Sequence, residues 1–495
     1  MQTRRLGLAV TLAGVLSASP MKAAEDAPRV LSQELKRFVE AFSAIARESA
    51  DPIPLEGAFH QGAIPGMLRT LDPFSVFFTP DQFSQFAAMQ DSERKGFGTI
   101  VSILPGRLIL LQALPGSPAV RAGLAAGDEI LAINDFDVAY LDVDQLTQLL
   151  ESARQKDVTL VVRHPGGNSP IDVKLSPQMM EKPTVDRAFR VAEGIGYLRI
   201  TSFEAATGVL VKETIEKLGG ESLKALVMDL RNNHGGAVEA ATEIASLFLA
   251  PDQLIFTTNG RHAGAQDVYV PKAAIPYTFP IAVLINGESA SASEILSGAL
   301  QDHDRGIVLG EPSYGKGLVQ QVMAISGGGG MALTIAFYYT PSGRSIQKPL
   351  NGGQLGAATR LIGKGNYRSD SGRPLAGGGG IQPDELVFPA PQTQLQIVLD
   401  ASGSFTSFAG DYRRGHRISE NIEITSEIRE AFRAYLSERR IQPNPVEWDV
   451  YRAWIETRLR QELVTLELGV VKGDELEARL DAVIQRAVKL LGGEP

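Results

Sequence analysis

Hydrophobic positions change their spacing along the chain, and each change predicts a different kind of element. Between residues 25 and 90, apolar residues return every three or four positions, which predicts helices. One face of this pattern carries Leu35, Phe38, Val39, Phe42 and Ile45. From about residue 179 to residue 390, short apolar runs alternate with helical patterns, which predicts an α/β sheet. Beyond about residue 391 long, charged, amphipathic patterns predict a helical extension to residue 495.

Both helical regions leave alternatives open. The N-terminal segment, residues 25–90, either packs against a second subunit or covers the core of its own chain. In the C-terminal extension, an apolar stripe is more often intramolecular core, although such an extension can also dimerise or dock an adaptor. The stripe consists of Trp448, Tyr451, Trp454, Ile455 and Leu459.

The first 24 residues have the pattern of an export signal. Arg4 and Arg5 precede an apolar run over residues 6–16, and small residues that suit cleavage follow at 17–19 and 23–24. The run is short for a helix that spans a bilayer, so we expect it to be cleaved. The mature protein is then soluble and exported, most simply to the periplasm.

Composition narrows the class of function. A chain of 495 residues, 44% apolar and 21% charged, is expected to be globular with two to four domains. Its net charge of −9, with no stretch rich in both basic and aromatic residues, argues against binding to nucleic acid. The absence of cysteine excludes disulfides and thiol catalysis. The six histidines have no metal-ligand spacing, so we expect neither a metal nor another cofactor.

Residues 286–296 carry the first sign of catalytic chemistry. They follow the apolar run 281–285 and lead into a helical pattern, which predicts a strand, a tight turn and a helix. A serine at such a helix N-terminus lies beside a backbone N–H, here that of Ala292, which can stabilise an oxyanion. The simpler interpretation is that Ser291 and Glu294 form a capping box.

A nucleophilic serine needs a base to take its proton. His303 is excluded, because twelve residues along the same predicted helix place it about 18 Å away. Lys316 lies between two glycines after a strand-like run, and burial would disfavour its charged form and make it a base. Gln320, four residues later, can hydrogen-bond the lysine amine and fix its direction.

The sequence of residues 289–294, followed by that of residues 314–320, resembles the C-terminal processing (tail-specific) peptidases, serine proteases that use a Ser-Lys dyad. The resemblance implies that Ser291 is the nucleophile, Lys316 the base and Gln320 the orienting residue. The separation of 25 residues between the serine and the lysine also matches the family. It further implies a crotonase-like α/β protease core over residues 179–390.

A double glycine offers the second oxyanion donor. Gly235 and Gly236 follow a predicted strand, and glycines there let the backbone approach a ligand closely, so we expect one of them to act beside the Ala292 N–H. A plain turn is the alternative. The family usually has proline before these glycines, whereas this chain has His234, which is the one rival to Lys316 as base.

Residues 91–178 resemble a PDZ domain, on the runs 116–124 and 127–134. Residues 99–103 offer a strand edge to an extended peptide, and a glycine loop before them can hold a terminal carboxylate. A helix over residues 143–152 would form the other wall, with Leu146 and Leu150 either lining the groove or filling the core. The expected peptide-binding residues are Gly96, Phe97, Gly98 and Thr99.

These features predict an exported serine endopeptidase that cleaves exported proteins from or near their C-termini. Its PDZ domain would bind substrate C-termini and gate activity, and an adaptor or a second copy bound through the helical segments would be a further partner. The alternatives are a catalytically silent binding protein on the same fold and a PDZ scaffold. A Gly-rich segment, residues 348–378, is either a flap near the cleft or a tolerated surface insertion.

Overall fold

The computed structural model describes residues 20–493 apart from 52–53, 55–56, 93–94, 115, 166–168, 181–182, 263, 350–364 and 390. The chain divides into two units, Met1–Met67 and Leu68–Pro495. Most of the predicted export signal, residues 1–19, lies outside the described residues. Within the described part, none of the helices combines the length and the apolar character needed to span a bilayer.

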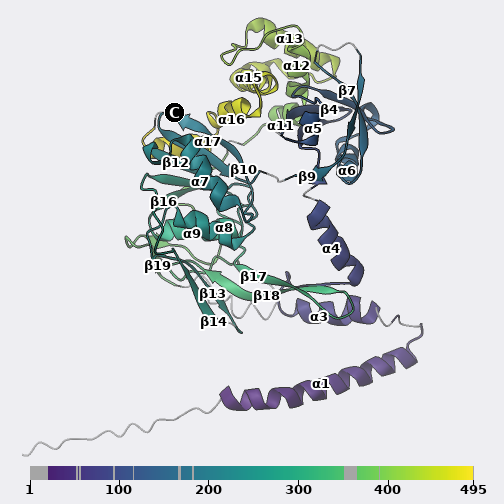
Figure 1. Ribbon diagram of the computed structural model, residues 1–495, viewed down its shortest axis with the longest axis vertical. Helices are drawn as coiled ribbons and strands as arrows, with labels where there is room; N and C mark the ends of the chain where they lie inside the picture. Colours follow the sequence, from purple (N-terminus) through teal and green to yellow (C-terminus); the bar gives the residue numbers. More distant parts are fainter. Residues whose placement is uncertain are drawn as a thin grey trace, which may run out of the picture. The chain divides into compact units, whose positions relative to one another are not determined.

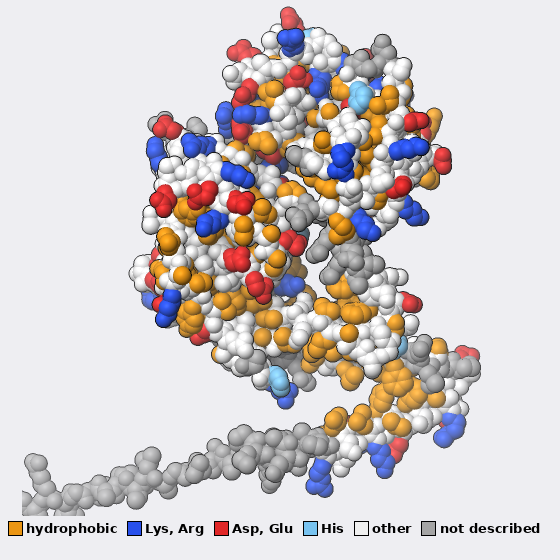
Figure 2. Space-filling model, viewed as in Figure 1, with side chains coloured by type: hydrophobic (Ala, Val, Ile, Leu, Met, Phe, Trp, Pro, Cys, Tyr) orange, Lys and Arg blue, Asp and Glu red, His pale blue; other side chains and the backbone are white. Residues whose placement is uncertain are grey.

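The first unit is helical, as its spacing predicts. Helix α1 (Pro20–Glu48) is followed by a short π-helix, η1 (Ala58–Ala63), and by the first residues of α3 (Ile64–Arg69). Hydrophobic side chains follow α1 on the face visible in Figure 2, and Leu31 and Leu35 are more than half exposed. The ring of Phe59 contacts those of Phe38 and Phe42, at centroid distances of 5.9 and 5.0 Å.

A mostly parallel sheet forms the centre of the second unit, in the order β10-β11-β12-β15-β16-β21. Only β10 and β11 pair antiparallel. The strands are β10 (Val185–Ala192), β11 (Ile195–Ile200), β12 (Ala225–Asp229), β15 (Ile281–Ile285), β16 (Gly306–Gly310) and β21 (Glu385–Leu386). Helices cover both faces, which explains why β15 is a continuous apolar run and β12 is apolar up to its last residue, Asp229. One face packs on α7 (Thr207–Leu218), α8 (Val238–Ser246) and α9 (Ala292–Asp302), and the other on α17 (Ala482–Leu490) (Figure 1).

A second sheet contains a strand that the sequence pattern did not predict. The sheet is formed by β1 (Val76–Phe78), β13 (Leu254–Gly260), β14 (Gly264–Tyr269), β17 (Leu318–Ala324) and β18 (Gly330–Tyr339). Strand β1 lies inside the segment 25–90 that we expected to be helical, between α3 and α4 (Pro80–Ser92). It is a strand because it pairs with β18, more than 250 residues later, and buries Phe77.

The predicted PDZ domain is a six-stranded antiparallel sheet with two helices. Its elements are β3 (Thr99–Leu104), β4 (Arg107–Ala113), α5 (Pro118–Arg121), β5 (Glu129–Ile133), β6 (Phe136–Asp137), η2 (Val138–Tyr140), α6 (Val143–Ala153), β7 (Val158–Arg163) and β8 (Ile171–Leu175). The strands that lead in and out, β2 (Lys95–Gly96) and β9 (Gln178–Met179), pair with each other. Leu146 is fully buried and Leu150 packs against the same cluster, so both belong to the domain core.

The C-terminal helices form an intramolecular core. They are α11 (Gln394–Ala401), α12 (Ser404–Tyr412), α13 (Ser426–Glu438), α14 (Pro445–Val450), α15 (Arg452–Leu468) and α16 (Val470–Ala478). Trp448, Ile455 and Leu459 of the predicted stripe are buried among them. The extension also packs on the PDZ domain, where Arg107 donates to Asp411 at 3.0 Å and Leu104 and Ile109 join a shared apolar cluster.

Half of the Gly-rich segment 348–378, residues 350–364, lies outside the described residues. At its start, Lys348 contacts the loop of Lys316, where its N–H donates to the Gly315 carbonyl at 3.1 Å. Farther along, the described part forms a small hairpin of β19 (Tyr367–Arg368) and β20 (Pro374–Leu375). It packs at the C-terminal end of α9, where the Asp370 N–H donates to the Asp302 carbonyl at 2.9 Å. That end of the helix is roughly 15 Å from Ser291, at 1.5 Å per residue, so this hairpin does not cover the nucleophile.

Candidate active site

Ser291 lies on a strained turn between the end of β15 and the start of α9. Its φ and ψ are 56° and −113°, a conformation that is unfavourable for any residue with a side chain. Neighbouring hydrogen bonds hold the turn in place: the Ser289 hydroxyl donates to the Leu230 carbonyl at 2.8 Å, and the Ala290 N–H donates to the Asn233 carbonyl at 3.0 Å. The turn therefore presents a half-buried serine at the carboxyl end of the sheet, as a nucleophile requires.

Glu294 joins this turn to the loop that carries Lys316. Its carboxylate is fully buried, and one oxygen, Oε2, accepts the N–H groups of both Ser291 and Lys316, each at 2.9 Å. The other oxygen accepts the Gly315 N–H at 2.7 Å and the Ser313 hydroxyl at 2.5 Å. The backbone nitrogens of Ser291 and Lys316 are consequently no farther apart than twice 2.9 Å. The structure brings the predicted nucleophile and base together.

The sequence suggested only a capping box for Glu294, and the structure gives it a larger role. A carboxylate in the otherwise small and apolar run that starts α9 was the signal for a buried partner, because glutamate is almost never fully buried without one. Burial raises the pKa of Glu294 above its usual range, while the four hydrogen bonds favour the ionised form. Its position in the first turn of α9 also favours the negative charge.

Lys316 is half-buried, and its loop is fixed on both sides. The Tyr314 N–H donates to the Ser289 carbonyl, and the Gly317 N–H donates to the side chain of Gln347, both at 2.9 Å. Gln320 has a partner that we did not expect: its side-chain NH₂ group donates to the Phe74 carbonyl at 2.9 Å. Among the described residues, no hydrogen bond joins Gln320 to Lys316 or Lys316 to Ser291.

The double glycine lies directly against the nucleophile. A Cβ atom on Gly235 would be 2.8 Å from the Ser291 Cβ and 3.1 Å from the Ala292 nitrogen, so only glycine permits this approach. The Gly235 N–H is already engaged, since it donates to the Asn233 side chain at 2.9 Å. The N–H groups of Gly236 and Ala292 have no recorded acceptor within the described residues, and Gly236 is exposed. Gly236 and Ala292 are thus the available pair of oxyanion donors.

The environment of His234 does not favour a role as the base. Its side chain is 73% exposed, and its Nδ1 lies 3.6 Å from a carboxylate oxygen of Glu288. No hydrogen bond to Ser291 is present in the described part of the chain. For metal binding, the described residues contain no suitable group of three or more His, Cys, Asp or Glu side chains.

The PDZ domain has the expected open edge. Strand β3 is the terminal strand of its sheet and pairs only with β4, and Ile100 on it is exposed. Gly98 has a φ of 70°, and a Cβ there would meet the Ser117 Cβ at 2.2 Å. Of the four predicted peptide-binding residues, Phe97 has its side chain in the domain core. The loop can therefore offer its backbone, rather than that phenyl ring, to a peptide.

Both the protease core and the PDZ domain are similar to known protein families. The pattern of Peptidase family S41 matches residues 194–353, which include Gly235, Gly236, Ser291 and Lys316, and that of the PDZ domain matches residues 110–164. A carboxyl-terminal-processing protease of Synechocystis is 34% identical over 292 residues, which cover 58% of this chain and 68% of that protein. A carboxy-terminal-processing protease of Bartonella bacilliformis is 32% identical, covering 64% and 73%. The carboxy-terminal processing protease CtpB of Bacillus subtilis is 30% identical, covering 67% and 69%.

Proposed function

Because the chain belongs to the carboxyl-terminal-processing proteases, serine-type peptidases of family S41, we propose that it cleaves exported proteins at or near their C-termini with a Ser291–Lys316 dyad. One observation carries this proposal: a single oxygen of Glu294 accepts the backbone N–H of both residues at 2.9 Å. These two bonds support the proposal that Ser291 and Lys316 act in one site.

The proposed reaction is acyl transfer through the serine. The neutral amine of Lys316 takes the hydroxyl proton of Ser291, and Oγ attacks the peptide carbonyl carbon. The N–H groups of Ala292 and Gly236 stabilise the oxyanion. When the C–N bond breaks, the leaving amine receives the proton from the lysine. The lysine then takes a proton from water, the hydroxide cleaves the ester, and the proton returns to Ser291 as the acid product leaves.

In this proposal the PDZ domain captures substrate C-termini. An extended C-terminal segment would add to the free edge of β3, and the loop of residues 96–99 would hold its carboxylate. Such capture concentrates chain ends near the catalytic site and gates activity. We expect a peptide with a free C-terminus to be cleaved at least several-fold faster than the same peptide with an amidated end. Equal rates would contradict this role for the domain.

The assay for the dyad compares residues 25–495 of wild type, Ser291→Ala, Lys316→Ala and His234→Ala on an unfolded protein. We expect cleavage by the wild type and the His234 variant and none by the other two. Cleavage that survives in Lys316→Ala but not in His234→Ala would make His234 the base. Failure of every form, including the wild type, would favour a silent binding protein.

The proposal also places the enzyme outside the cytoplasm, on the pattern of residues 1–24. The N-terminal sequence of the protein recovered from cells tests it. We expect the mature chain to begin between residues 18 and 25, and a chain that retains the apolar run 6–16 would contradict cleavage.

A further inference from the structure

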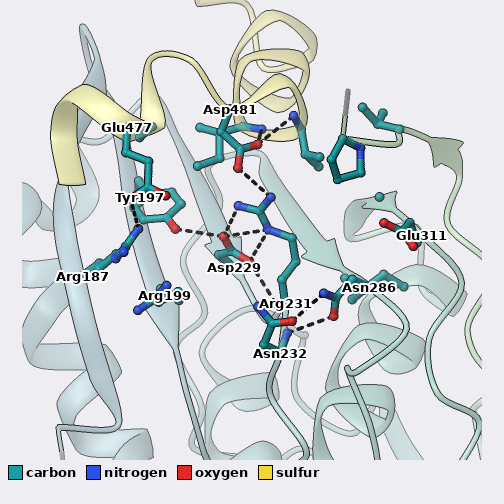
Figure 3. A pocket seen from close by; sticks show the side chains of 17 residues that line it. Arg187, Tyr197, Arg199, Asp229, Arg231, Asn232, Asn286, Glu311, Glu477 and Asp481 are labelled. Atoms are coloured by element: carbon teal, nitrogen blue, oxygen red, sulfur yellow. Dashed lines mark hydrogen bonds and ion pairs between the residues drawn. The ribbon is translucent and has the colours of Figure 1, made fainter. Parts of the chain in front are cut away.

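The C-terminal helices reach the catalytic side of the sheet through one aspartate. Asp481 lines a cavity of about 250 Å³ at the carboxyl ends of the central strands (Figure 3). Its Oδ2 accepts a hydrogen bond at 2.8 Å from Arg231, which follows β12. Its Oδ1 accepts the N–H groups of Val483 and Ile484 at 2.9 and 3.0 Å, so the same side chain caps α17.

Asp481 is held firmly enough to act as an anchor. The apolar face of α17 is buried against β12 and β15, with Val483 and Ile484 each less than a tenth exposed. The helix cannot shift without opening that cluster. Arg231 is therefore clamped between a fixed carboxylate in the extension and a buried one in the sheet, Asp229, which its Nη2 meets at 2.6 Å.

Arg231 also lies in the loop after β12 that carries one of the two proposed oxyanion donors, Gly236. The next residue, Asn232, has a φ of 59° and exchanges two hydrogen bonds with Asn286 in the nucleophile turn, at 2.9 and 2.8 Å. Asn233 then donates to the Ile200 carbonyl at 2.8 Å and accepts the Gly235 N–H at 2.9 Å. Arg231, Asn232, Asn233 and Gly235 thus each make a hydrogen bond, and together these bonds limit the position of the Gly236 N–H.

We propose that Asp481 is a positioning residue for peptide hydrolysis: by holding Arg231 it fixes the loop that presents Gly236 to the transition state. This inference rests on the proposed function. Without Asp481, the Nη1 group of Arg231 loses its carboxylate, and only the bonds of Nε and Nη2 to Asp229 hold the guanidinium. Oxyanion donors stabilise a transition state only while they stay preorganised, so the loss falls on kcat rather than on KM.

The C-terminal extension is then part of the catalytic apparatus. Its helices α12 and α15 contact the PDZ domain, as the cluster around Leu104 and Ile109 shows, while the end that precedes α17 holds Arg231. One continuous segment thus touches both the domain that would bind the substrate C-terminus and the loop that would bind the oxyanion.

The test uses the mature chain with Asp481→Ser. Serine preserves the helix cap but is too short to reach Arg231. We expect kcat on an unfolded protein to fall roughly 10- to 100-fold, with KM changed less than about threefold. The melting temperature should stay within about 3 °C, because the cap remains. Glu477→Gln is the matched control: it lines the same cavity but pairs with Arg187, and it should keep wild-type kcat.

A double-mutant cycle with Arg231→Lys separates positioning from general damage. Lysine has one ammonium group and cannot hold both carboxylates as the guanidinium does. We expect Arg231→Lys to lower kcat by a similar factor and the double variant to lose little more. A wild-type kcat in Asp481→Ser, or fully multiplicative losses in the double variant, would overturn the inference. Activity that persists in Ser291→Ala would instead overturn the proposed function.

Discussion

Two loops flank Ser291, and the chain fixes them in different ways. On the lysine side, one buried carboxylate, Glu294, collects four donors from residues 291–316, and three of them are backbone N–H groups. On the oxyanion side, a second buried carboxylate, Asp229, holds an arginine, and that arginine reaches a partner 250 residues later in the C-terminal extension. The first network is local, and the second depends on a distant segment.

The difference follows from the groups that stabilise each buried carboxylate. Glu294 lies in the first turn of α9, where the helix dipole and peptide N–H groups stabilise an anion without a cation. Asp229 lies at the end of a strand, outside any helix N-terminus, and accepts one peptide N–H, that of Arg231 at 3.0 Å, together with the Arg231 guanidinium and the hydroxyl of Tyr197. Burial lowers the pKa of Arg231, but Asp229 and Asp481 more than offset this and raise it above its usual value. The Glu294 network would stay intact without the C-terminal extension, whereas the network of Asp229 and Arg231 would lose Asp481.

Breaking the local network should have the largest effect. In Glu294→Gln an amide replaces the carboxylate, and its NH₂ group would face backbone donors that it cannot satisfy. We expect kcat to fall by at least about 100-fold and the free energy of unfolding to fall by about 3 kcal/mol. Denaturant unfolding and steady-state cleavage measure the two losses.

Ser297→Ala is the control for that change, because Ser297 is buried on the same helix but bonds only to the Ser293 and Glu294 carbonyls. It should keep kcat within about twofold. If Glu294→Gln kept wild-type kcat, the carboxylate would be a cap and nothing more.

Gly235→Ala should have the next largest effect, on the oxyanion side. The new methyl group would press on the Ser291 Cβ and the Ala290 carbonyl at 2.8 Å, in a backbone with a φ of 100°. Displacement of one oxyanion donor costs about 100-fold in kcat, and we expect KM to change little. Gly287, in the turn that carries Ser291, has open space around it, so Gly287→Ala should keep wild-type kcat. If Gly235→Ala kept wild-type activity, the loop of residues 231–236 could be displaced without loss of catalysis.

The smallest effect concerns another contact between the extension and the core. Asp474 in α16 lies 3.1 Å from Arg187, and burial raises its pKa from 3.8 to about 6, with the arginine opposing. The folded state therefore binds this proton more tightly than the unfolded state. The stability that the proton contributes is complete below pH 4 and is lost as the pH rises through about 6.

Asp474→Asn cannot titrate, so its stability relative to the wild type should rise between pH 4 and pH 7.5, by at most about 3 kcal/mol. Its kcat should match that of the wild type, since Arg187 does not lead into a catalytic loop. Chemical unfolding at the two pH values measures the first quantity. If the stability difference between Asp474→Asn and the wild type were the same at both pH values, Asp474 would have the same pKa in the folded and unfolded states. A large fall in kcat would mean that activity also depends on the contact between Asp474 and Arg187.

The sequence could predict the parts of the site that local spacing determines. A buried strand, a small-residue turn and a helix place Ser291, and glycines on either side of Lys316 and at 235 and 236 mark the places where backbones approach. The α/β core and the helical ends follow from the same spacing, and the PDZ insert from a resemblance over residues 116–134; all are confirmed, apart from strand β1.

Long-range partners decided the rest. Glu294 looked like a cap because its other donors, Ser313, Gly315 and Lys316, come from a loop that no helical pattern connects to it. Gln320 bonds to Phe74, 246 residues earlier, so its spacing from Lys316 could not reveal the contact. Strand β1 was hidden in a helical region because its pairing partner is β18, and Asp481 is 250 residues from Arg231.

The paired strands β2 and β9 have a consequence for the chain as a polymer. Lys95 lies opposite Met179 and Gly96 opposite Gln178, so the whole PDZ domain leaves and rejoins the protease within one short ladder. To the protease sheet this insert is a loop whose ends are already closed, and loop-closure entropy grows only with the logarithm of length, about 0.6 kcal/mol for each doubling. The stability of the protease sheet therefore depends little on the length of the inserted domain. Residues can be added to or removed from that domain without repacking of the protease core.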